Sequence, residues 1–175
     1  MSRERKDARQ KLAGLDLPKG YRLKDIVNAV ARERSRDIVI HPLKLDGEIS
    51  GLCVVGDHRD FIFVDNTASP FFRTHITLHE LAHLLEGDGV TSGTCVSVNR
   101  SALSIRRTQA PLSALPKSLV EEVRGRPVKL RADYTSLEER RAEIFATCAL
   151  MSLPRPEVET LAPIYSAFGG KGTRL

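Results

Sequence analysis

Residues 79–83 read His-Glu-Leu-Ala-His, the HExxH pattern. Positions four apart share one face of an α-helix, so His79 and His83 can direct imidazole nitrogens at a single metal ion. Glu80 lies beside them, where its carboxylate can take a proton from a water molecule that the metal polarises. A catalytic zinc ion takes three protein ligands and keeps one position open. The pattern therefore predicts a zinc hydrolase site whose third ligand must come from elsewhere in the chain.

A second predicted helix, rich in glutamate, offers that ligand. Glu139 and Glu143 are four residues apart and share a face with two alanines, which allow close approach to the first helix. We assign Glu139 to the metal, and Glu143 to the distal nitrogen of a ligating histidine, because carboxylates commonly hold such rings. Glu143 as the metal ligand is the main alternative, and Glu138 is a weaker one.

Two further side chains are candidates for supporting roles. His75 lies one turn before His79, so it could support the ligands or contact substrate; a structural, partly exposed position is the alternative. Tyr134 lies five residues before Glu139, and its phenol could stabilise the oxyanion formed in hydrolysis; a packing or capping role is the alternative. Zinc is the expected metal, although manganese or another divalent ion suits the same ligands.

The spacing of apolar residues predicts the elements that carry these side chains. Helices are expected over residues 22–34, 71–86 and 136–153, a strand over 37–41, and a hairpin formed by 52–55 and 61–64. Residues 1–20 are interpreted as a flexible N-terminal arm with at most one short helix, 21–156 as a single domain containing a long loop region at 87–118, and 157–175 as a flexible tail.

The composition limits the possible partners and location. No apolar run approaches the length of a membrane span, and the charged N-terminus is unlike a secretory signal. Three scattered cysteines form no disulfide framework, so we expect a cytoplasmic protein. The net charge is +5, but only 5% of residues are aromatic and none is Trp, so direct nucleic-acid binding is not expected.

The segment HELAHLL, followed by a Glu-x-x-Ala-x-x-Phe-Ala element (Glu139, Ala142, Phe145, Ala146), resembles the ImmA/IrrE family of metallopeptidases over roughly residues 22–154. The resemblance implies a zincin-like α+β domain, in which a small mixed β-sheet packs against helices and HExxH lies on a central helix. It also implies a cytoplasmic zinc endopeptidase that cleaves a specific protein, typically a helix-turn-helix transcriptional repressor encoded nearby.

The chain departs from the family pattern in two places. Glu143 stands where family members often carry Asn or Asp, and the helix ends in ALMSLP where LLMP is common. The branch of the family, and with it the substrate, stays open. A catalytically silent, zinc-stabilised domain that binds a regulatory partner is the alternative function. By analogy with zincins that bind peptide as an added strand, residues 61–65 are the candidate strand near the cleft.

Overall fold

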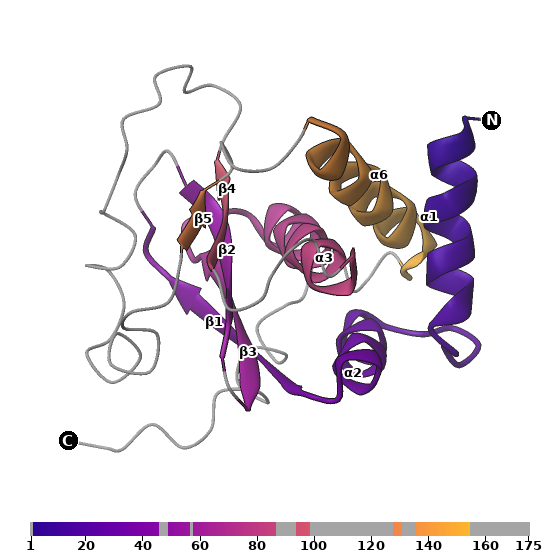
Figure 1. Cartoon of the computed structure of the whole chain (residues 1–175), viewed down its shortest axis with the longest axis horizontal. Helices are drawn as coiled ribbons and strands as arrows, with labels where there is room; N and C mark the ends of the chain where they lie inside the picture. The colour runs from indigo at the N-terminus through magenta and orange to yellow at the C-terminus, as the bar shows by residue number, and fades with distance from the viewer. Residues whose placement is uncertain are drawn as a thin grey trace.

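The computed structural model describes residues 2–45, 49–56, 58–86, 94–98, 128–130 and 136–154. Within these residues the fold is α+β, and the helices lie on one side of a mixed β-sheet (Figure 1). The helices are α1 (Arg3–Gly14), α2 (Leu23–Arg34), α3 (Pro70–Glu86) and α6 (Ser136–Ser152). The strands are β1 (Asp37–Leu43), β2 (Ile49–Val55), β3 (Arg59–Asp65), β4 (Thr94–Val98) and β5 (Val128–Leu130).

The described strands form one sheet in the order β1-β3-β2-β4-β5. Strands β2 and β3 are antiparallel neighbours with Cys53 opposite Ile62, which confirms the predicted hairpin. Strand β1 runs parallel to β3, and β5 runs parallel to β4. Strand β4 lies inside the region that was expected to be a loop and pairs with β2. Its sequence, TCVSV, carries the β-branched residues that favour strands, and this signal was overlooked.

The expected role of residues 61–65 as a strand open to substrate is wrong. They belong to β3, which is hydrogen-bonded to β1 on one side and to β2 on the other. An added peptide strand needs an unpaired edge, and β3 has none. The run from Asp60 to Val64 is buried throughout, as expected for a strand covered on both faces.

The N-terminal segment also differs from the expected flexible arm. Residues 3–14 form α1, which begins after Ser2, whose side chain accepts a hydrogen bond from the Arg5 N–H. Ala8, Leu12 and Leu15 recur at helical spacing and are buried in the core shared with α6. Because the buried face of α1 has only these few apolar residues, the sequence of the segment is mostly polar. The helix nevertheless packs against the core as part of the domain.

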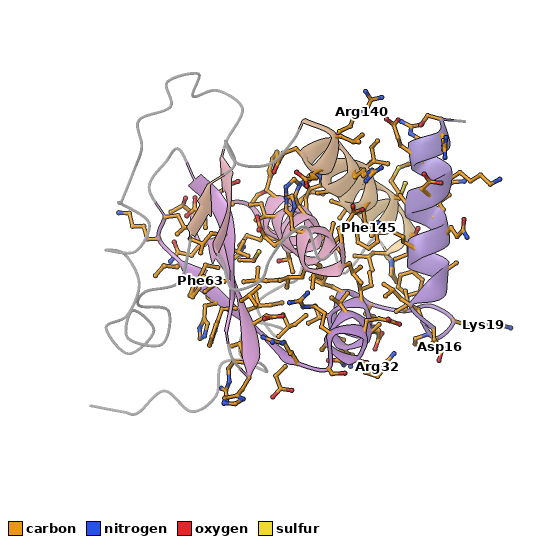
Figure 2. The ribbon with its side chains drawn as sticks, viewed as in Figure 1. Asp16, Lys19, Arg32, Phe63, Arg140 and Phe145 are labelled. Carbon is orange, nitrogen blue, oxygen red and sulfur yellow. The ribbon has the colours of Figure 1, made fainter. Side chains whose placement is uncertain are left out.

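Helix α3 occupies the middle of the molecule, between the sheet and α6 (Figure 1). Leu78, Leu81 and Leu84 are fully buried, because a helix that is apolar on nearly all sides must be covered on all of them. Figure 2 shows Phe63 on the sheet and Phe145 among the helices, and both side chains are buried. The helices predicted over residues 22–34, 71–86 and 136–153 are confirmed as α2, α3 and α6.

Among the described helices, none combines the length and the apolar character needed to cross a membrane. Most of the predicted loop region at 87–118 and all of the predicted tail at 157–175 lie outside the described residues.

Candidate metal centre

Helix α3 begins at a strong local start signal. Ser69 precedes it and accepts a hydrogen bond from the Phe72 N–H through its side chain, and Pro70 occupies the first helical position, where its missing N–H costs nothing. The buried hydroxyls of Thr74 and Thr77 donate to the carbonyls of Pro70 and Arg73. Residues close in sequence therefore determine where the helix that carries the histidines begins.

The far end of α3 is held by a buried ion pair. Arg34 on α2 contacts Asp60 on β3, with 2.5 Å between Nε and Oδ2, and it also donates to the Leu84 carbonyl in the last turns of α3. Asp60 is fully buried, and Arg36 lies 3.8 Å from its other oxygen. A buried carboxylate is stable only when it is paired. The pair therefore joins α2, the sheet and the metal helix, a role that the sequence analysis missed.

Helix α6 packs directly against α3. Ala142, Ala146 and Ala149 are almost completely buried, as expected of small side chains that let two helices approach closely. The contacts run in opposite directions along the two helices: Glu139 lies against His79 and His83, and Glu143 lies one turn away, against His75 and His79. The helices are therefore antiparallel, and each turn of α6 meets an earlier turn of α3.

Three of the predicted ligands come together at this contact. The Nε2 atoms of His79 and His83 are 3.0 Å apart. Glu139 places Oε1 3.2 Å from Nε2 of His83 and Oε2 3.7 Å from Nε2 of His79. Ligand atoms about 2.1 Å from a tetrahedral zinc ion lie about 3.4 Å from one another. The separation of the two Nε2 atoms and the separation of His83 Nε2 from Glu139 Oε1 are close to that value. With one ligand atom taken from each residue, the three atoms all lie within 4.8 Å of one another, so this donor set could hold a metal ion.

Glu143 lies on the opposite side of the His79 ring. Its Oε2 is 3.6 Å from Nδ1 of His79, and its Oε1 is 3.6 Å from Nε2 of His75. The position matches the predicted support of the ligand ring through its distal nitrogen. Burial lowers the pKa of His75; the Glu143 carboxylate acts in the opposite direction and His79 adds to the lowering. His75 therefore shares the Glu143 carboxylate with the ligand His79.

Glu80 is fully buried, with an exposed fraction of 0%. It packs against β2 at Gly51: a Cβ atom added there would lie 3.2 Å from Oε1 of Glu80 and 2.3 Å from Cγ2 of Ile76. Strand β2 can approach the metal helix this closely only because residue 51 is glycine. Gly51 was not singled out by sequence reasoning, because a lone glycine in a strand does not reveal what it faces.

Tyr134, the candidate for oxyanion stabilisation, lies outside the described residues.

Outside the donor set, His41 is half-buried on β1 and stacks on Phe63, with ring centroids 5.7 Å apart. Its burial lowers its pKa.

Comparison of the chain with protein-family models, with curated proteins and with solved structures finds no match.

Proposed function

We propose that this chain is a zincin-like, zinc-dependent endopeptidase of the ImmA/IrrE type. The observation that carries the proposal is the convergence of His79, His83 and Glu139 from two helices at separations suited to one ion. HExxH alone would be compatible with many hydrolases. The third ligand, the Glu139 carboxylate, comes from the helix that also bears the Glu-x-x-Ala-x-x-Phe-Ala element, and this favours the family.

Each residue has a distinct part in the proposed hydrolysis. A zinc ion held by the three ligands would supply Lewis acidity, which makes water more acidic and a carbonyl more electrophilic. Glu80 accepts the proton of the attacking water and passes it to the departing amine as the C–N bond breaks and a C–O bond forms. The Glu143 carboxylate, 3.6 Å from Nδ1 of His79, favours a proton on that nitrogen and so leaves Nε2 available to the metal.

We further propose that the substrate is a cytoplasmic helix-turn-helix repressor encoded near this protein. This part rests on the motif resemblance alone. The substrate is expected to be cut once or a few times, because a regulatory peptidase must recognise its partner before cleaving it.

A catalytically silent, metal-stabilised partner-binding domain is the second candidate. The complete burial of Glu80 against β2 favours it, because a general base must reach water. The two candidates share the metal ligands and differ in what Glu80 does.

The test measures metal binding and peptide cleavage separately. Purified wild type should contain about one zinc ion per chain; Glu139→Ala should lose it, and Glu138→Ala, on the same helix turn, should keep it. Glu80→Gln should retain zinc but lose repressor cleavage, whereas Glu33→Gln, an exposed carboxamide control on α2, should cleave normally. Zinc-loaded wild type that binds the repressor without cutting it would favour the silent domain, and cleavage by Glu80→Gln at the wild-type rate would refute the mechanism.

A further inference from the structure

An apolar pocket of about 410 Å³ lies between the first turns of α3 and the second half of α6. We call it the Phe71 pocket. Phe71 and Phe72 line it from α3, and Thr147, Leu150 and Met151 line it from α6. Its size and its mainly apolar walls are those of a pocket that takes a side chain or a small ligand.

The walls of the pocket leave large apolar groups in contact with water. Phe71 is 47% exposed, Phe72 60% and Met151 83%. Among the described residues only one other large hydrophobic side chain, Leu137, is exposed, and it lies at the other end of α6. Clustered exposure of this kind marks binding surfaces, and methionine adapts its shape to different apolar partners.

The pocket shares Glu143 with the surroundings of the candidate metal centre. Its polar end is formed by His75 and Glu143, and the same Glu143 carboxylate lies 3.6 Å from Nδ1 of His79. Along the two antiparallel helices, the donor set, the Glu143 contact and the apolar walls follow one another at intervals of about one turn, roughly 5.4 Å. An extended peptide advances about 3.3 Å per residue. A peptide crossing the metal centre would therefore bring a neighbouring side chain to the pocket.

We propose that the Phe71 pocket binds a large apolar side chain of the substrate, aromatic or long aliphatic, within about two residues of the cleaved bond. This inference rests on the proposed peptidase function and adds to it a rule for substrate choice. The apolar walls select the side chain by burial. The Glu143 carboxylate at the inner end disfavours aspartate and glutamate by charge repulsion.

The test measures binding and cleavage separately. Fluorescein-labelled peptide pairs that differ only by Phe or Ala at one position are titrated into zinc-loaded Glu80→Gln protein and followed by anisotropy. The Phe peptide should bind about tenfold more tightly or better, as expected for burial of an aromatic side chain. Thr147→Phe, which fills the pocket, and Met151→Asp, which adds a charge at its mouth, should each reduce this preference to about twofold or less. Leu137→Asp, a matched change of an exposed apolar residue on the same helix, should keep it.

The pocket proposal is overturned if the Phe and Ala peptides bind equally or not at all, or if Thr147→Phe keeps the preference for Phe. It is also overturned if the wild type forms a concentration-dependent dimer that Met151→Asp dissociates. That dimer would assign this face to a second copy of the chain.

Hydrolysis of the same peptides by the wild-type protein shows whether the pocket proposal or the proposed peptidase function has failed. Cleavage without side-chain preference overturns the pocket and leaves the peptidase. Selective binding without cleavage supports the pocket and overturns the peptidase.

Discussion

Gly51 provides the most direct test of how the sheet positions Glu80. In Gly51→Ala the new methyl group would lie 2.3 Å from Cγ2 of Ile76 and 3.2 Å from Oε1 of Glu80. Cγ2 is bonded directly to the β-carbon, and a helical isoleucine is confined almost to one χ1 rotamer, so Ile76 cannot simply swing away. The strand or the helix must move instead. Overpacking of this kind costs about 1–3 kcal/mol of unfolding free energy.

The assay is urea unfolding followed by circular dichroism, with metal removed from all samples so that binding does not contribute. Gly14→Ala is the matched control, because no heavy atom lies within 4 Å of its added Cβ and it closes helix α1. It should be neutral or stabilise by up to about 1 kcal/mol. Peptide cleavage by Gly51→Ala should fall further than its stability predicts, because the displaced carboxylate is the proposed general base.

A double mutant tests whether the residue 51 methyl group and Ile76 compete for the same space. Ile76→Ala removes the atom that clashes and should cost about 2–5 kcal/mol alone, because Ile76 is buried. Combined with Gly51→Ala, the loss should be smaller than the sum by about 1–2 kcal/mol, since the new methyl occupies vacated space. Additive effects, or a Gly51→Ala variant as stable as wild type, would refute a close approach of β2 to α3.

Three further predictions concern the metal support, the pH dependence and the buried ion pair. Glu143→Ala should weaken zinc binding about 10- to 100-fold in a chelator competition, and Glu138→Ala should leave it unchanged. Burial lowers the pKa of His41 below its usual 6.5, so the unfolded chain binds the proton more readily and stability falls as the pH drops below that value. His41→Leu should therefore lose less stability than wild type between about pH 8 and pH 5.5 in urea titrations. Arg34→Met should destabilise by about 3–5 kcal/mol in the same unfolding assay, because Asp60 is left buried with only the more distant Arg36.

Each of these has a contradicting result. Equal zinc affinity in Glu143→Ala and wild type would mean that the carboxylate does not support His79. Parallel stability curves for His41→Leu and wild type would mean that this histidine does not resist protonation in the fold. A loss below about 1 kcal/mol in Arg34→Met would mean that the pair with Asp60 contributes little to holding the end of α3.

Much of the fold could be predicted because it depends on short-range patterns. The 3.6-residue spacing of apolar side chains marked α2, α3 and α6, and two apolar runs around a turn marked the β2–β3 hairpin. Helix α1 was not predicted as an integral helix, because its apolar residues are few and its contact with α6 is what makes it part of the core. Strand β4 is a short run of strand-favouring residues within the predicted loop region, and its pairing with β2 places it in the sheet.

The sequence by itself determined that His79 and His83 share one helical face with Glu80 beside them, because that geometry follows from four-residue spacing alone. It placed the third ligand on one later helix and favoured Glu139, with Glu143 and Glu138 left as alternatives. Whether Glu139 or Glu143 lies beside both histidines depends on the position of α6 along the axis of α3. The packing of the buried faces of the two helices determines that position. The closeness of Gly51 to Glu80, and the place of Glu143 between the Phe71 pocket and His79, are likewise decided only by tertiary packing, since they join residues distant in the chain.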